Sequence, residues 1–349
     1  MHTPRLRKLW MQSFYVPFNA STLTSLYLNR TSEHALPPPA QFLCMLHSCT
    51  KLQNLSLLNW IPADLGPALE PTISLPTLYF LNVADRFNRC IALGSYITLP
   101  PFTSRNFSFT HIGTAEARTA SYFDLMEPYF KCAFSLPVAS LVCRHPGPHT
   151  AFFNLKTTSG VLRQHSQSVQ PISHTFVFTV ADSESRLSFR RIFYRFAKTL
   201  DLTRTRQLTL QLGRIHPYPV NVWRDLLVPL SRIETLYLQD YASVWLMPVL
   251  APTGNEAAPM LPQLRFLWIQ SLDLYGKDSG DVRNAMTRKD LLFHFIERKR
   301  TGYPLERLRI DKLIVDKDEA IKTLLPRLRA IIPVVECGLD NSLGPVTEQ

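Results

Sequence analysis

Three segments near the carboxyl end of the chain share one spacing of apolar residues, and this spacing restricts the fold more than any other feature. Each reads L-x-x-L-x-L, with isoleucine accepted at the first or last position: Ile233-Glu-Thr-Leu236-Tyr-Leu238, Leu264-Arg-Phe-Leu267-Trp-Ile269 and Leu305-Glu-Arg-Leu308-Arg-Ile310. One copy would be weak support, because 46% of the residues are hydrophobic and the spacing can arise by chance. Three copies separated by turn-rich and amphipathic stretches predict a repeated structural unit.

The same spacing recurs in the amino-terminal third of the chain. Further copies begin at Leu6, Leu23, Leu52 and Leu78, and a related strand covers Leu208–Leu212. From the copy at Leu23 to that at Leu78, and from the Leu208–Leu212 strand to the copy at Leu305, successive copies lie 26 to 41 residues apart, which suits a strand and a helix in each unit. We therefore predict an α/β leucine-rich-repeat solenoid, or horseshoe, with a parallel sheet on the concave face and helices on the convex face.

The solenoid is expected to cover residues 1–338, followed by a tail at 339–349. The pattern degrades over about 100–174, where alternation predicts strands near Phe107, Leu141, Phe152 and Phe176, and we expect one continuous sheet across this region. Residues 144–149 contain two prolines and a glycine, so they are expected to form a hinge rather than a strand. Residues 271–286 are expected to form an inserted loop. Helices are predicted at 42–46, 119–134, 187–200, 221–230, 291–296 and 321–325.

Composition restricts the cellular setting. The six cysteines have no regular spacing and no C-x-x-C pair, which indicates reduced, mostly buried thiols. The basic amino-terminal residues are not followed by an apolar run of signal-peptide length, and no window resembles a membrane span. We expect a soluble intracellular protein, cytoplasmic or nuclear, without membrane contact.

Sequence signatures of catalysis are absent. The chain has no P-loop, no G-x-G-x-x-G, no G-x-S-x-G and no H-E-x-x-H. Cys143-x-His145-x3-His149 offers three metal-ligand types, but Pro146 and Pro148 interrupt it and a plain polar loop is favoured. We expect no enzymatic activity, no cofactor and no metal.

A net charge of +11 would attract acidic proteins or nucleic acid. The densest basic cluster has its middle members at helical spacing, which favours the solvated face of a surface helix and leaves nucleic-acid contact as the alternative function. Its members are Arg186, Arg190, Arg191, Arg195, Lys198, Arg204 and Arg206.

The positions between the leucines of each repeat are expected to point outward on the sheet face. On the carboxyl-terminal repeats these outward positions hold aromatic residues and arginines, which are typical of binding hot spots. The predicted partner-binding residues are Tyr237, Phe266, Trp268, Arg307 and Arg309. Tyr237, Trp268 and Arg309 should form a continuous row. The alternative is that the 271–286 loop covers Phe266 and Trp268.

Two local motifs resemble the repeat region of the fungal F-box/leucine-rich-repeat proteins. They are the helix ending that runs from Phe295 through Arg300-Thr-Gly302-Tyr-Pro304 into Leu305, and the L-P-x-L entries Leu75–Leu78 and Leu261–Leu264. The resemblance implies a protein-protein interaction module that acts as a substrate-recognition subunit of an F-box-type ubiquitin ligase. Nothing in this sequence matches an F-box, so a Skp-type adaptor is expected as a partner only of a full-length form that carries one.

Overall fold

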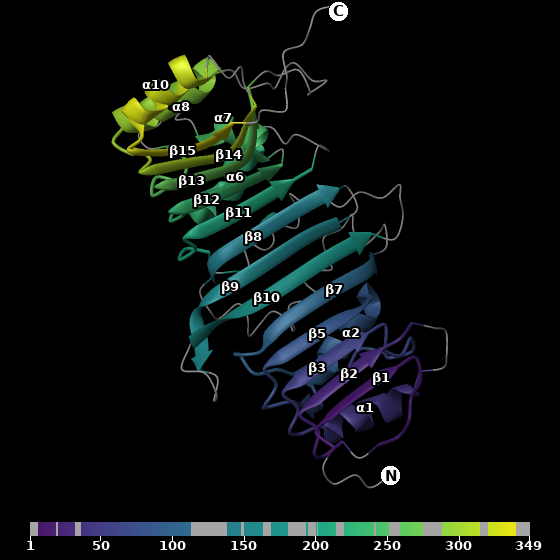
Figure 1. The fold of residues 1–349 in the computed structure, drawn as a ribbon. Helices are drawn as coiled ribbons and strands as arrows, with labels where there is room; N and C mark the ends of the chain where they lie inside the picture. The colour runs from purple at the N-terminus through teal and green to yellow at the C-terminus, as the bar shows by residue number, and fades with distance from the viewer. Residues whose placement is uncertain are drawn as a thin grey trace, which may run out of the picture. The chain divides into compact units, whose positions relative to one another are not determined.

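A computed structural model describes residues 6–18, 20–31, 36–112, 138–147, 150–162, 169–180, 193–194, 200, 202–213, 220–240, 242–250, 259–274, 288–314 and 320–339. It shows a mixed α/β protein with parallel sheets and few helices in these ranges (Figure 1). The chain divides into two compact units, residues 1–137 with 148–201 and residues 138–147 with 202–349. The predicted helix at 119–134 and nearly all of that at 187–200 lie outside the described residues.

The first unit contains a sheet in which neighbouring strands pair in parallel from β1 to β10. In order across the sheet, the strands are β1 (Lys8–Gln12), β2 (Ser25–Asn29), β3 (Asn54–Leu58), β5 (Phe80–Arg86), β7 (Ser104–Ile112), β10 (Val169–Val180) and β9 (Thr150–Leu162). The described helices are α1 (Pro39–Ser48) and α2 (Phe87–Tyr96), and α2 packs on β5 and β7. Short strands β4 (Ile73–Ser74) and β6 (Ile97–Thr98) pair in parallel.

The second unit contains a sheet of parallel neighbours as well. Its strands follow the order β8 (Val138–Gly147), β11 (Gln207–Leu212), β12 (Thr235–Asp240), β13 (Phe266–Asp273), β14 (Arg307–Ile314) and β15 (Val334–Leu339). The helical elements are α6 (Val220–Leu227), the 3-10 turn η1 (Val228–Leu230), α7 (Ala242–Leu250), α8 (Arg288–Arg300), the π-helical turn η3 (Ala320–Leu324) and α10 (Leu325–Ile331). Helix α7 packs on β11, β12 and β13, and α6, α7, α8 and α10 contact one another in sequence.

The predicted core leucines occupy matching places in successive strands. Leu26 pairs with Leu55 and Leu55 with Leu81 in the first unit. In the second unit the corresponding row is Leu208, Leu236, Leu267 and Leu308. All of these side chains are at most 2% exposed, so the L-x-x-L-x-L spacing correctly identified both the strands and their buried face.

A repeated turn explains the L-P-x-L entries. The Leu78 N–H donates to the Leu75 carbonyl at 3.1 Å, and the Leu264 N–H donates to the Leu261 carbonyl at the same distance. Proline at the second place of such a turn supplies the required φ and needs no donor. After each turn, the residue before the strand and the first residue of the strand donate to one carbonyl, that of the residue before the neighbouring strand; Arg265 and Phe266 share the Glu234 carbonyl in this way.

The middle of the chain departs from the predicted all-parallel sheet. Strands β9 and β10 pair antiparallel, with Asn154 opposite Thr175, while β10 pairs in parallel with β7. The expectation of parallel pairing throughout was therefore wrong here. Alternation identified these strands, but it carries no information on which neighbour each strand joins.

Two predicted loops begin as strands. Residues Arg144–Gly147, expected to be a hinge, complete β8; the pairing with β11 ends at His145, so Pro146 is not required to donate in that ladder. The insert expected from Ser271 starts later, because β13 continues to Asp273 beside β14 and buries Leu272. Residues 275–287 lie outside the described ranges.

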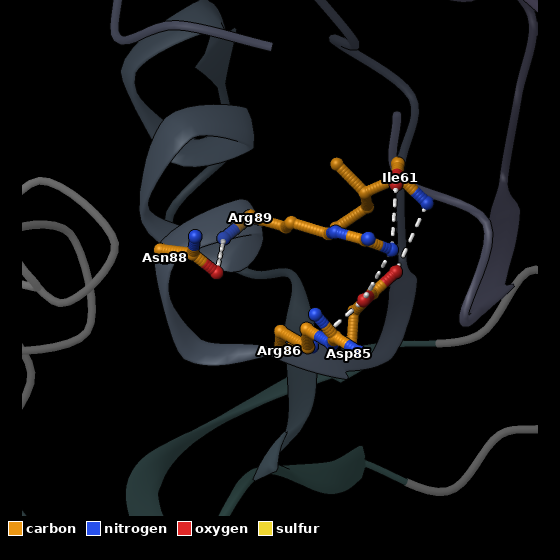
Figure 2. A network of polar contacts seen from close by, with 5 residues as sticks. All are labelled: Ile61, Asp85, Arg86, Asn88 and Arg89. Atoms are coloured by element: carbon orange, nitrogen blue, oxygen red, sulfur yellow. Dashed lines mark hydrogen bonds and ion pairs between the residues drawn. The ribbon is translucent and has the colours of Figure 1, made fainter. Parts of the chain in front are cut away.

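A buried carboxylate fastens a loop in the first unit (Figure 2). Asp85 is 1% exposed at the end of β5 and accepts hydrogen bonds from the backbone N–H groups of Ile61 at 3.0 Å and Arg86 at 2.7 Å. The Arg89 guanidinium lies 3.4 Å from the same carboxylate and donates to the Ile61 carbonyl. Burial raises the pKa of Asp85, while these hydrogen bonds and the Arg89 charge partly oppose the rise.

A buried guanidinium fastens a loop in the second unit. Arg298 of α8 is 2% exposed and donates to the carbonyls of Met260 at 3.1 Å, Leu261 at 3.1 Å and Leu264 at 3.4 Å. Burial lowers the pKa of Arg298 to about 10. This contact fixes the turn from which β13 begins, and so it positions the residues that β13 carries.

Candidate binding surface

The outward positions of β12, β13 and β14 place three of the predicted residues side by side. Tyr237 is the register partner of Trp268, and Trp268 is the register partner of Arg309. Because hydrogen-bonded parallel strands lie about 4.8 Å apart, side chains in such a row can touch. The predicted row is therefore present in the structure.

Trp268 is held between its two neighbours. The Tyr237 and Trp268 ring centroids are 5.2 Å apart at an interplanar angle of 54°, and the Arg309 guanidinium carbon lies 4.2 Å from the Trp268 ring centroid. Tilted aromatic pairs and a cation over a tryptophan face are both favourable electrostatic arrangements. The contacts leave Trp268 half-buried by side chains of its own sheet face.

Asp311 joins two of these groups through its carboxylate. Its Oδ2 accepts the Trp268 Nε1–H at 2.6 Å, and its Oδ1 accepts the Arg309 Nε–H at 2.7 Å. The hydrogen bond from Arg309, with the negative charge of Asp311, raises the pKa of Arg309. We call Tyr237, Trp268, Arg309 and Asp311 the Trp268 cluster; its two central side chains are oriented before any partner binds.

A strand irregularity accompanies Asp311. Arg309 pairs with Glu336 and Ile310 with Cys337, but the register then shifts so that Leu313 pairs with Leu339. Asp311 and Lys312 of β14 thus lie opposite the single residue Gly338 of β15, and this two-to-one pairing defines a β-bulge. Both β14 residues are exposed.

Gly338 is required by the close approach of the two strands at this bulge. A Cβ added there would lie 2.2 Å from the Asp311 carbonyl oxygen, far inside van der Waals contact. A larger residue at position 338 would therefore displace the backbone of Asp311, and with it the carboxylate that orients Trp268 and Arg309.

The other two predicted residues form a neighbouring row. Phe266 is the register partner of Arg307 and is 37% exposed. Arg307 forms an ion pair with Glu336 of β15. All five predicted residues are therefore on the outward positions of β12–β14. The alternative that residues 271–286 cover Trp268 and Phe266 falls largely on residues outside the described ranges.

Sequence reasoning missed the two carboxylates that hold the arginines. Asp311 follows the last apolar position of its repeat and was not predicted as a member of the site, and Glu336 lies on a strand that was not predicted. The spacing Ile332-x-x-Val335-x-Cys337 is a degenerate copy of the repeat and could have identified β15. With Asp311 and Glu336 present, the outward face of β14 and β15 carries two carboxylates beside the predicted arginines.

The sheet face of the first unit has a different composition. The row that corresponds to Tyr237 and Trp268, the fifth residue of each L-x-x-L-x-L copy and its register partner on β7, consists of Trp10, Tyr27, Ser56, Asn82 and Asn106. Asn82 donates to Ser56 at 3.0 Å, and two residues earlier along β3 Asn54 donates to Ser25 at 3.2 Å. Trp10 is 73% exposed, with its ring centroid 6.4 Å from that of Tyr27.

The described residues offer little support for other sites. Within them no group of three or more His, Cys, Asp or Glu side chains could hold a metal ion. Burial raises the pKa of the Cys90 and Cys143 thiols well above the ordinary value, which disfavours the reactive thiolate. No helix in the described ranges is long and apolar enough to cross a membrane.

Comparison with protein-family models finds no match, and comparison with curated protein sequences finds none either.

Proposed function

We propose that the chain is a leucine-rich-repeat solenoid that binds another protein through the outward face of β12–β14. The Trp268 cluster carries this proposal: a tryptophan and an arginine are oriented on a sheet face by three neighbours, and Phe266 is exposed nearby. Tryptophan, tyrosine and arginine dominate measured hot spots in protein interfaces. Orientation before binding reduces the entropy lost when a partner docks.

The partner is proposed to be a substrate of a ubiquitin ligase, with a Skp-type adaptor as a second partner if a full-length form has an F-box. This part rests on the sequence resemblance of Leu75–Leu78, Leu261–Leu264 and the end of α8. The L-P-x-L turns have a structural role in starting β5 and β13, so the resemblance in those motifs concerns the repeat and not a catalytic site.

Affinity purification of the full-length gene product from its native cell tests the proposal. The expected result is a protein that copurifies with the unmodified chain and is depleted with Trp268→Ala. Trp10→Ala is the matched control, because it removes an exposed tryptophan from the first unit. Equal recovery with all three proteins would contradict the proposed surface, and recovery of a Skp-type adaptor would support the ligase role.

Nucleic-acid binding is the alternative function, and the salt dependence of oligonucleotide affinity distinguishes it from protein binding. Phosphate-driven affinity for duplex or single-stranded oligonucleotides should fall steeply between about 50 and 200 mM salt. The proposed protein-binding function predicts no salt-dependent oligonucleotide complex that involves Trp268. An oligonucleotide complex that Trp268→Ala abolishes would replace the proposed function.

A further inference from the structure

The charges and donors of the Trp268 cluster indicate which kind of protein segment it binds. This inference rests on the proposed function. We propose that the cluster recognises an acidic segment of its protein partner, with a partner carboxylate bound by the two terminal nitrogens of Arg309 and the adjacent apolar residues packed against Tyr237, Trp268 and Phe266.

The terminal N–H groups of Arg309 can bind a carboxylate of the partner. Its Nε–H donates to Asp311, and within the part of the chain that the structure describes neither Nη nitrogen donates a hydrogen bond. A guanidinium offers these terminal N–H groups in a planar fork that matches the two oxygens of a carboxylate. Contact with Trp268 on one side and Asp311 at Nε fixes the plane of this fork.

A basic partner is disfavoured by the same contacts. The face of Trp268 that would attract a cation is already occupied by Arg309, and both oxygens of Asp311 already accept hydrogen bonds. Glu336 is likewise paired with Arg307. A partner lysine or arginine would have to share each carboxylate with the arginine already bound to it, so it gains less than a partner carboxylate gains at the terminal nitrogens of Arg309.

A carboxylate is favoured over a phosphate by the flanking acids. Asp311 is 34% exposed and Glu336 is 42% exposed, so both remain close enough to water and to a ligand to repel a dianion more strongly than a monoanion. The chain as a whole carries a net charge of +11, which attracts an acidic segment from a distance. The exposed Phe266 ring adds apolar area for residues next to the carboxylate.

Three synthetic heptapeptides test the preference directly. They share the same phenylalanines and differ only in three positions, which are all glutamate, all glutamine or all lysine. The readout is the ¹⁵N-labelled indole signals of the five tryptophans in the full chain, with the Trp268 signal assigned by its loss in Trp268→Phe. The glutamate peptide is expected to shift the Trp268 signal with a Kd about tenfold lower than the glutamine peptide, as suits a charge-assisted bidentate contact.

Two variants that each remove one negative charge distinguish the effect of the fixed Arg309 guanidinium plane from the effect of net charge. Asp311→Asn and Glu336→Gln each remove one negative charge from the same face. The proposal predicts that Asp311→Asn weakens the glutamate peptide about threefold or more, since the guanidinium plane is released, while Glu336→Gln leaves it equal or tighter. Arg309→Lys keeps the charge without the fork, and it should lose about tenfold.

Each alternative outcome overturns the inference. Tighter binding of the lysine peptide, equal strengthening by Asp311→Asn and Glu336→Gln, or a Trp268 shift by inorganic phosphate at lower concentration than by the glutamate peptide would each contradict it. If the glutamate peptide leaves the Trp268 signal unchanged while Trp268→Ala still depletes the copurified protein, the acidic preference is wrong and the proposed function stands. Failure of Trp268→Ala to deplete any protein removes the function itself.

Discussion

The two units of this protein use the same arrangement of parallel strands to present different side chains. In the first unit, Leu26, Leu55 and Leu81 form a buried row, and the outward row beside it runs from Trp10 and Tyr27 to Ser56 and Asn82, which bond to one another. In the second unit the buried row is again leucine, but the outward row contains Tyr237 and Trp268. Amide–hydroxyl pairs satisfy their own polar groups and offer little apolar area. In the second row, Arg309 lies over the Trp268 ring and Asp311 accepts hydrogen bonds from both side chains, so the tryptophan is oriented for a partner.

The buried leucine rows, which the two units share, stabilise the fold, and the outward rows, which differ, determine binding. Substitutions in the leucine rows should therefore have similar effects in both units. Substitutions in the outward rows should have different effects.

The largest expected effect is the loss of a core leucine. Leu55→Ala and Leu267→Ala each remove a side chain at most 2% exposed from the same place in the repeat, so each should cost about 2 to 5 kcal/mol of unfolding free energy. Urea unfolding followed by circular dichroism measures the cost. A cost below about 1 kcal/mol at either position, well under the range for core truncations, would show that the two rows are not equivalent.

Removing the buried guanidinium should have the next largest effect. Arg298→Met leaves the carbonyls of Met260 and Leu264 without this donor in a buried turn, which should cost about 1 to 3 kcal/mol. Arg300→Met is the matched control, because it removes the same charge from an exposed position of α8 and should not change the urea midpoint. Equal shifts of the midpoint would indicate that only net charge matters.

Sequence patterns predicted these buried rows because burial repeats with the strand period, and they predicted the outward row because side chains alternate across a strand. The contacts of Asp311 were beyond this reasoning, since they depend on a bulge opposite Gly338 that no periodicity contains. The antiparallel pairing of β9 with β10 was also missed, because alternating aromatic residues identify a strand without its partner. Strand β15 escaped detection because valine and cysteine replace leucine at Val335 and Cys337.

A smaller effect is expected from the titration of Asp85 in the first unit. Burial raises its pKa in the folded protein above the ordinary value of 3.8, so the folded state binds this proton more tightly than the unfolded state does. The contribution of Asp85 to the unfolding free energy should therefore fall as the pH rises from 3.8 through the raised pKa. The Asp85→Asn side chain cannot titrate. The unfolding free energy of the wild type minus that of the variant, measured by urea unfolding, should therefore decrease as the pH rises over this window. An increase would mean that Ile61, Arg86 and Arg89 outweigh the burial.

Calorimetric titration of the copurified protein onto the full chain tests the central claim, that the outward row of the second unit is the binding surface. Trp268→Ala is predicted to weaken binding by about 2 kcal/mol or more, the scale of a hot-spot truncation, with the urea midpoint nearly unchanged. Trp10→Ala, which removes a tryptophan that is 73% exposed on the first unit, is predicted to leave the affinity unchanged. Unchanged affinity in Trp268→Ala, or an equal loss in Trp10→Ala, would contradict the claim.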